Sequence, residues 1–190
     1  MPRVAALLAA GSGSRFHGPQ HKLLATLHGR PVWEWALHQV LAADFDFVVV
    51  VTGAVELTLP PAAGLINRHN PQWQLGQAGS VLEAIDAAHG LGAHEVTIGL
   101  ADQPFVTAAA WRAVATAEPE CHIVIATYDG VPGPNPVRLD RAVWPLLPTD
   151  GDAGARHLIR EHPEWVCPVP CVGSVADIDT LEDLERWKNC

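Results

Sequence analysis

Residues 3–15 of the chain read Arg-Val-Ala-Ala-Leu-Leu-Ala-Ala-Gly-Ser-Gly-Ser-Arg, an apolar run followed at once by a glycine-rich turn. A short apolar run bounded by turn residues is typical of a buried strand. Glycines let the backbone come close to an anion and direct several N–H groups toward it. The stretch therefore predicts a buried strand at Arg3–Ala9 that ends in an anion-binding loop.

Apolar runs rich in Val, Ile and Leu alternate with helix-like segments along the rest of the chain. The predicted strands are Phe45–Thr52, Leu65–Asn67, Glu95–Ala101, His122–Tyr128 and an edge strand at Trp165–Val169. The predicted helices are Val32–Ala43, Ser80–His89, Thr107–Ala117, Ala153–His162 and Thr180–Trp187. Such alternation favours a mostly parallel sheet covered on both faces, a three-layer α/β/α Rossmann-like fold. No linker is visible, so we expect a single domain over residues 1–190.

Capping residues mark the starts of several of these helices. Ser80 with Glu83 and Thr180 with Asp183 have the spacing of a capping box. Thr107 and Asp152 are the N-caps expected for two further helices. Between them, Asp129–Pro136 is rich in Gly and Pro, which predicts a turn or hairpin.

The formal net charge of −9 opposes binding to nucleic acid and to anionic membranes. An anion site must therefore be built locally. Residues 1–33 contain no Asp or Glu, yet they contain Arg3, Arg15, Lys22 and Arg30. The N-terminal segment is thus the part of the chain best suited to bind a phosphorylated ligand.

Every apolar run is too short or too interrupted to cross a bilayer, so we expect a cytoplasmic protein with no membrane contact. The four cysteines are Cys121, Cys167, Cys171 and Cys190. In that compartment they are expected to be reduced thiols.

The glycine-rich loop from Leu8 to Arg15, together with Lys22, is the first candidate site. It is not a Walker A loop, because no Gly-Lys-Ser/Thr closes it. It also lacks the third glycine of a dinucleotide fingerprint. Arg15 and Lys22 would supply positive charge for phosphates. The alternative interpretation is a tight loop at the end of a strand, with solvated charges.

Two acidic segments are candidate cation ligands. Asp102 follows the strand Glu95–Ala101 and could hold Mg²⁺, which binds one or two carboxylates plus phosphate oxygens. A turn residue before Pro104 is the alternative. In the second segment Asp179 is assigned to a helix start, whereas Asp177 is the acid least explained by capping. Asp177 is therefore the candidate for a second metal carboxylate.

Asn70, Gly79 and Ser80 form a third candidate group, because a helix N-terminus can bind phosphate or ribose oxygens. An ordinary helix cap is the alternative. The segment Gly151–Arg156, taken on its spacing alone, predicts a helix start.

Taken together, the order and spacing of these motifs resemble the MobA-like NTP transferase family, typified by molybdenum cofactor cytidylyltransferase, over nearly the whole chain. The resemblance implies a nucleotidyltransferase in which Arg15, Lys22 and Asp102 are catalytic. It implies that Asp102 and Asp177 bind Mg²⁺. The residues that it implies for nucleotide binding are Leu8, Ala9, Ala10, Gly11, Gly13, Arg15, Lys22, Asn70, Gly79 and Ser80.

The reaction that the resemblance implies is transfer of CMP from CTP to the terminal phosphate of a molybdopterin-type cofactor, with release of pyrophosphate. Ala10 resembles the cytidylyl branch, since the guanylyl branch tends to carry glycine there. A molybdoenzyme is implied as a transient partner. Two stretches depart from the family pattern: Phe16–His21 is longer than usual, and Pro134-Asn135, in the loop expected to face the acceptor, replaces a common Gly-His.

Three alternatives stay open on the sequence. The first is a guanylyltransferase for the same type of cofactor. The second is an NTP transferase that acts on a sugar phosphate, a polyol phosphate or a phospholactate. The third belongs to a different class, a non-catalytic nucleotide-binding chaperone that delivers a cofactor.

Overall fold

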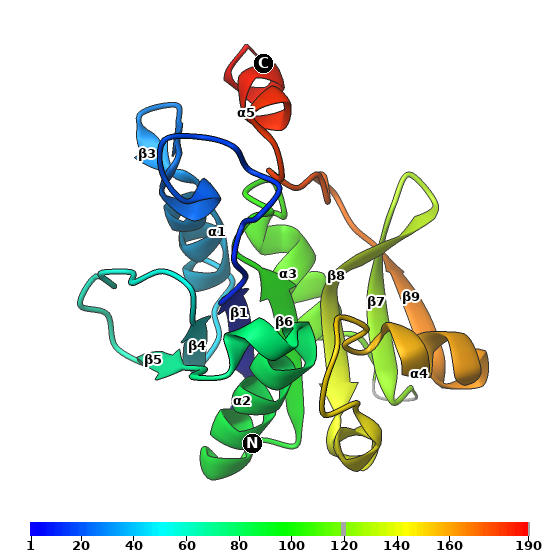
Figure 1. Ribbon diagram of the computed structural model, residues 1–190. Coiled ribbons are helices and arrows are strands. Elements are labelled where there is room, and N and C mark those ends of the chain that lie inside the picture. Colours follow the sequence, from blue (N-terminus) through cyan, green and yellow to red (C-terminus); the bar gives the residue numbers. More distant parts are fainter. Residues whose placement is uncertain (119–120, 190) are drawn as a thin grey trace.

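The computed structural model describes residues 1–118 and 121–189, and within these ranges one large sheet has the strand order β5-β4-β1-β6-β8-β7-β9 (Figure 1). Its strands are β1 Val4–Ala9, β4 Phe47–Thr52, β5 Leu65–His69, β6 Glu95–Leu100, β7 Ile123–Tyr128, β8 Val131–Asp140 and β9 Val166–Pro170. β8 runs antiparallel to β6 and β7, and the other pairs are parallel. The predicted mostly parallel sheet is confirmed.

Helices cover both faces of this sheet. The α-helices are α1 Val32–Leu41, α2 Gln77–Gly90, α3 Ala108–Ala115, α4 Arg156–Glu161 and α5 Leu181–Lys188. Alternate residues of β1 point to opposite faces, as the pleat of a strand requires. Leu7 packs in the core cluster that contains α1 and α3 residues, whereas Leu8 packs in the cluster that contains α2 and α4 residues. The three-layer α/β/α fold is therefore confirmed.

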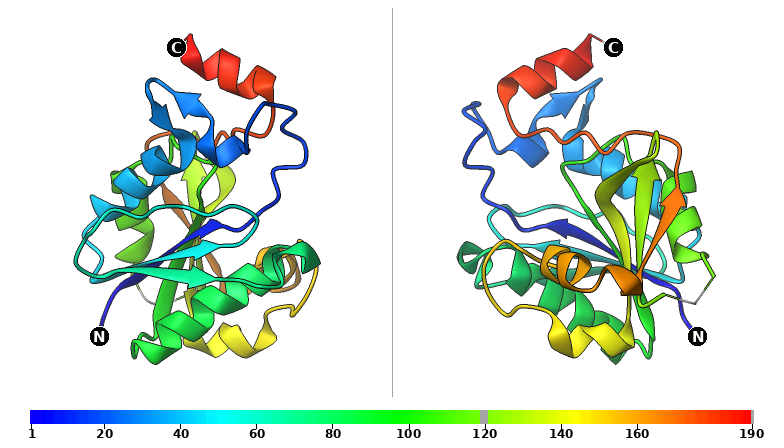
Figure 2. Two further views of the ribbon diagram at one scale, coloured as in Figure 1. Left: turned by 60° about the vertical axis from the view of Figure 1, so that its left-hand side comes forward. Right: turned by 90° about the vertical axis from the view of Figure 1, so that its right-hand side faces the viewer.

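A smaller third core joins residues 16–35 to the segment that contains α5. A short hairpin of β2 Thr26–Leu27 and β3 Arg30–Pro31 packs against α5, with Leu27, Ile178 and Leu184 buried between them. α5 lies beside this hairpin at the end of the molecule opposite the N-terminus (Figures 1 and 2). The segment that leads into α5 is thereby held across the carboxyl ends of the strands.

Most predicted elements form within a few residues of their expected bounds. Thr107 caps α3, and Thr180 with Asp183 forms the expected capping box of α5. β9 is an edge strand, as its prolines indicated. The segment expected as a turn or hairpin is a tight turn at Asp129-Gly130, followed by the long antiparallel strand β8.

The predicted N-caps Ser80 and Asp152 are both wrong, and one interaction explains both differences. α2 begins at Gln77, before Ser80, because Asp152 Oδ1 accepts a hydrogen bond from the Gln77 N–H at 3.1 Å. The Gly151 carbonyl accepts another from the Ala78 N–H at 2.9 Å. Asp152 therefore caps α2, which is distant in sequence, and does not cap α4.

The described helices include none that is long and apolar enough to cross a membrane. Cys121 and Cys167 are joined in a disulfide, so the expectation of reduced thiols is wrong for this pair. The bond connects the start of β7 to β9. Cys171 is a free thiol, and Cys190 lies outside the described residues.

A glycine in β6 gives a test of the packing between the sheet and α3. A Cβ at Gly99 would lie 2.5 Å from Cζ2 of the buried Trp111 ring. We expect Gly99→Ala to lower the free energy of unfolding by about 1–3 kcal/mol, the usual effect of overpacking a core. The measurement is urea denaturation followed by circular dichroism.

Gly90→Ala is the matched control, because nothing lies within 4 Å of a Cβ at that end of α2. We expect that substitution to leave stability unchanged or to raise it by up to about 1 kcal/mol. Equal stabilities of the two variants would contradict the close approach of Trp111 to β6.

Candidate active site

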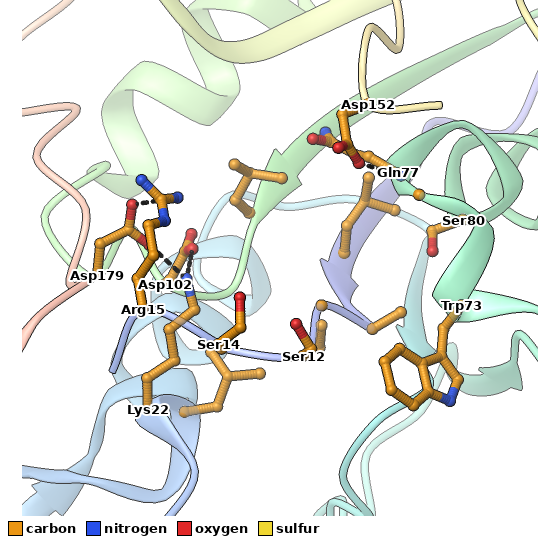
Figure 3. Close-up of a pocket in the computed structure, with 18 of the residues that line it drawn as sticks. Ser12, Ser14, Arg15, Lys22, Trp73, Gln77, Ser80, Asp102, Asp152 and Asp179 are labelled. Carbon is orange, nitrogen blue, oxygen red and sulfur yellow. Dashed lines mark hydrogen bonds and ion pairs between the residues drawn. The ribbon is translucent and has the colours of Figure 1, made fainter. Parts of the chain in front are cut away.

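A cleft of about 660 Å³ opens at the carboxyl ends of β1 and β6, where the strand order reverses direction (Figure 3). Ligands of open α/β sheets bind at such a reversal. The walls come from the loop after β1, from residues 73–77 before and at the start of α2, and from the 177–179 segment before α5. Parts of the chain that are far apart in sequence therefore meet at one site.

The glycine-rich loop is held in shape by His21. The His21 Nδ1 accepts a hydrogen bond from the Leu23 N–H at 3.3 Å, which leaves the ring proton on Nε2. That Nε2 lies 3.0 Å from the Gly11 carbonyl and donates to it. Gly13 has φ +63°, and a Cβ there would lie 3.1 Å from His21 Nε2. The neutral imidazole of His21 and the absence of a side chain at Gly13 thus fix the conformation of the loop.

Burial lowers the pKa of His21, and the nearby Lys22 charge acts in the same direction. A second proton on Nδ1 would also face the Leu23 N–H and lose that hydrogen bond. The loop is therefore organised by a histidine that stays neutral.

Lys22 lies at the centre of an ion-pair cluster. Its Nζ is 2.6 Å from Asp102 Oδ2 and 2.6 Å from Asp179 Oδ1, and all three side chains are at most 16% exposed. Burial disfavours the charged ammonium, but the charge and hydrogen bond of Asp102, followed by those of Asp179, raise the pKa of Lys22 overall. Lys22 is thus a fixed positive charge at the floor of the cleft.

Arg15 extends this cluster toward solvent. Its guanidinium lies 2.6 Å from Asp179 Oδ2, while its side chain is 76% exposed. Exposed ion pairs contribute little to stability because water screens them. Arg15 can therefore exchange Asp179 for another anion at low cost.

Asp102 has an acceptor to spare. Its Oδ1 is buried and has no hydrogen-bond partner among the described residues. Its backbone carbonyl accepts from the Ile178 N–H at 2.9 Å, which ties the β6 end to the 177–179 segment. Burial raises the pKa of the nearby Asp177, as do the charges of Asp179 and Asp102. A cation near these carboxylates would relieve that repulsion.

Few side chains at this site could serve as ligands of a metal ion. Within residues 1–118 and 121–189, no three His, Cys, Asp or Glu side chains come together in a group that could hold a metal ion. A cation here would depend on one or two carboxylates and take other ligands from phosphates and water. This is how proteins ordinarily bind Mg²⁺, so the residues fit that ion.

A buried polar bridge positions the carboxylates from behind. The Asn135 Nδ2 donates to Gln103 Oε1 at 2.9 Å, and the Gln103 Nε2 donates to the Val175 carbonyl at 3.0 Å. The Tyr128 hydroxyl donates to the Asn135 carbonyl at 3.1 Å. The β7–β8 hairpin, the Asp102 loop and the approach to Asp177 are thereby linked through Gln103.

Most residues expected at the site do line the cleft. These are Leu8, Ala9, Ala10, Gly11, Gly13, Arg15, Lys22, Ser80, Asp102 and Asp177. Asn70 and Gly79 lie behind it. Asn70 is buried and donates to Ser80 Oγ at 3.0 Å, and a Cβ at Gly79 would lie 3.3 Å from the Asn70 amide nitrogen. Both residues position Ser80 from behind the cleft wall.

Asp179 is the main residue that the sequence analysis assigned elsewhere. Its backbone N–H does belong to the start of α5, since it donates to Asp183 Oδ2 at 3.2 Å. Its side chain, however, binds Lys22 and Arg15 in the cleft. Trp73, Asp152 and Arg156 also line the cleft, although Asp152 and Arg156 were expected only at a helix start and Trp73 was given no role.

A protein-family model described as the MobA-like NTP transferase domain matches residues 5–165, more than half of the chain. The chain belongs to the MobA-like NTP transferase family. The match runs from β1 to the turn before β9 and includes the glycine-rich loop, Lys22 and Asp102.

Relatives of this chain differ in length. The purine catabolism protein PucB of Bacillus subtilis is 28% identical over 196 residues, which cover 96% of this chain and 94% of PucB. The bifunctional protein GlmU of Zymomonas mobilis is 37% identical over 90 residues, which cover 45% of this chain and 20% of GlmU. The chain therefore spans about a fifth of the length of that GlmU.

Solved structures show the same fold. The crystal structure of Rv0371c from Mycobacterium tuberculosis H37Rv has a TM-score of 0.82 at 24% identity, and the comparison covers 100% of both chains. A manganese complex of the same protein has a TM-score of 0.78 at 23% identity and covers 100% of this chain and 99% of that one.

The neutral state of His21 leads to a prediction about pH. A pKa below the usual value means that the folded chain disfavours the proton, so His21 stabilises folding fully above about pH 6.5. We expect this stabilisation to be lost as the pH falls from there through the lowered pKa. Denaturant unfolding between pH 7.5 and 5 measures it, as does the NMR titration of the ring.

In His21→Gln the side chain at position 21 has no proton to gain, so the loss of stability on the acid side should shrink. His17→Gln, which replaces an exposed histidine of the same loop, is the control and should keep the wild-type pH profile. A profile in His21→Gln identical to that of the wild type would refute the role given to the ring.

Proposed function

We propose that the chain is a nucleotidyltransferase, acting as a single domain over residues 1–190, that transfers CMP from CTP to the terminal phosphate of a molybdopterin-type acceptor and releases pyrophosphate. The observation that carries this proposal is the meeting of the glycine-rich loop with the Lys22–Asp102–Asp179 cluster in one cleft. Membership of the MobA-like NTP transferase family supports the type of reaction.

The triphosphate is proposed to lie between the loop and the cluster. Residues 10–13 line the cleft, and the backbone N–H groups of such a loop can donate to phosphate oxygens. Arg15 exchanges its exposed pair with Asp179 for the phosphates. Lys22 offers a preorganised ammonium at the point where negative charge develops, the arrangement that contributes most in such reactions.

Mg²⁺ is the proposed cofactor, held by Asp102 with Asp179 or Asp177. The unpartnered Oδ1 of Asp102 supports its assignment as the main ligand. When bound, a divalent cation would offset negative charge on the phosphates. The manganese complex of the structurally similar Rv0371c also supports a divalent cation in this family.

The chemistry needs no general base. An acceptor phosphate is already ionised at neutral pH, so one of its oxygens can form a bond to the α-phosphorus of CTP. The bond from that phosphorus to the bridging oxygen of the β-phosphate breaks, and pyrophosphate leaves with the electron pair. The chain contributes position and charge stabilisation through Arg15 and Lys22.

The choice of CTP over GTP rests on Ala10, which resembles the cytidylyl branch of the family. We expect calorimetry with CTP, GTP, ATP and UTP, with and without Mg²⁺, to show a Mg²⁺-dependent preference for CTP. A preference for GTP would reassign the chain to a guanylyl or phospholactate branch. A chain that binds none of the four nucleotides would refute the proposal.

The acceptor is assigned from the motif resemblance. Pyrophosphate release should occur with CTP and a molybdopterin-type acceptor, and it should not occur with a sugar phosphate or a phospholactate. CTP binding with no pyrophosphate release from any acceptor would instead favour the chaperone alternative.

Removal of Lys22 tests the mechanism. We expect Lys22→Ala to lower kcat/KM by more than about tenfold, because one preorganised charge of this kind contributes over 1.4 kcal/mol to the transition state. Circular dichroism checks that the variant is folded. Turnover close to wild type would exclude Lys22 from the mechanism.

Asp102→Asn tests the metal assignment with a side chain of nearly the same shape. We expect it to abolish Mg²⁺-dependent turnover and to weaken Mn²⁺ binding, measured by electron paramagnetic resonance. Asp140→Asn is the control, since Asp140 lies at the end of β8, outside the residues that line the cleft. If Asp102→Asn bound Mn²⁺ as the wild type does, Asp102 would not be the ligand.

A further inference from the structure

Trp73 differs from the other six tryptophans of the chain. Each of the others packs in a core cluster, and these are Trp33, Trp35, Trp111, Trp144, Trp165 and Trp187. All of them except Trp33 also have a ring, cation–π or hydrogen-bond partner. Trp73 belongs to none of these clusters. Across the described ranges, neither its ring nor its indole N–H has a partner of these kinds. The part-buried Trp73 ring is therefore available to an aromatic partner at the cleft wall.

The position of Trp73 is nevertheless firmly fixed. It begins the 3₁₀ turn Trp73–Leu75, just before α2. A Cβ at Gly53 would lie 2.7 Å from Trp73 Cβ and 2.8 Å from Ala10 Cβ. The missing side chain at Gly53 thus allows Trp73 to lie directly beside the glycine-rich loop. Trp73 is thus held at the cleft wall by the 3₁₀ turn and by the close approach of its Cβ to Gly53.

The cleft is polarised along its length. Arg15, Lys22, Asp102 and Asp179 gather at one side, and Trp73 lies at the other, with Ser12 and Ser14 between them (Figure 3). Asp152 lies on the Trp73 side, but it is already engaged with the Gln77 N–H. One side therefore suits an anion and a cation, and the other offers an aromatic ring with the polar side chains of Gln77 and Ser80 nearby.

A nucleoside triphosphate has the same polarity, with charge at the phosphates and an aromatic base at the far end. We propose that the Trp73 indole stacks on the nucleobase and is an affinity determinant for the nucleotide. The inference rests on the proposed function and adds to it a residue that the family resemblance did not assign. The phosphates then lie toward Lys22, and the ribose lies over the loop near Ser12.

Stacking tolerates any base, because every base has a π-face. Trp73 should therefore strengthen the binding of CTP and GTP by similar factors, while the preference between them is set by groups that contact the base edge. Alanine substitution at stacking positions in other proteins weakens binding by roughly five- to a hundredfold per base. A loss of this size is measurable by calorimetry.

The test compares Trp73→Leu and Trp73→Phe with the wild type, using two probes in the presence of Mg²⁺. CTP has a base, whereas inorganic tripolyphosphate has the phosphates alone. We expect Trp73→Leu to weaken CTP binding by about tenfold or more and to leave tripolyphosphate binding within about twofold. Trp73→Phe keeps an aromatic face and should retain most of the affinity for CTP.

Fluorescence and kinetics give two further readouts. CTP should quench the tryptophan fluorescence of the wild type and should quench that of Trp73→Phe much less. In Trp73→Leu, KM for CTP should rise while kcat stays close to wild type, because stacking acts equally before and during the reaction. Trp35→Phe is the control, since Trp35 packs against Leu27 and Arg30, outside the residues that line the cleft.

The outcomes separate this inference from the proposed function. Equal losses for CTP and tripolyphosphate in Trp73→Leu would mean that Trp73 only supports the loop, which overturns the inference. Unchanged CTP binding in that variant would overturn it as well, although the nucleotidyltransferase proposal would stand. A wild-type chain that binds neither probe would overturn both.

Discussion

The bond of one ammonium group to two carboxylates holds the cleft together. Lys22 reaches Asp102 and Asp179, which lie 80 and 157 residues away along the chain, and water is largely excluded from all three. Loss of one partner from such a group leaves a charge buried without compensation, which is costly. The loop before Lys22, the end of β6 and the segment before α5 are therefore positioned as one unit. In the proposed function, the interaction that orders the site also places a positive charge where an anionic ligand would lie.

The Gln103 bridge adds a second level of organisation. Gln103 bonds to Asn135 in the β7–β8 hairpin on one side and to the Val175 carbonyl on the other. A buried amide of this kind is costly to leave unsatisfied, so its partners constrain one another. The Asn135 amide is directed inward to Gln103. The β7–β8 hairpin and the loop that carries Asp102 are thus linked through a single side chain.

The order of strands and helices could be predicted from the sequence because apolar periodicity and local caps are short-range signals. Lys22 and Asp102 could be found for a related reason, since a strand end and an acid-free segment are both visible in the sequence. Asp179 was assigned to a helix start because its backbone takes part in the α5 cap, and sequence cannot tell where the side chain of such a residue points. Asp152 caps a helix 75 residues away, a pairing that no local rule can identify. β8 contains three prolines, which hid a strand that pairs on both sides, and the close approach of Trp73 to the glycine-rich loop depends on Gly53, 20 residues earlier.

The placement of the two acids has a consequence for biosynthesis. Translation delivers Lys22 before Asp102, and Asp102 before Asp179 and α5. Domains generally fold as units. A growing chain that has not reached residue 179 therefore lacks one of the two carboxylates that Lys22 binds. The cleft is completed only when α5 closes over the β2–β3 hairpin, so a translation product interrupted before this point would lack a finished site.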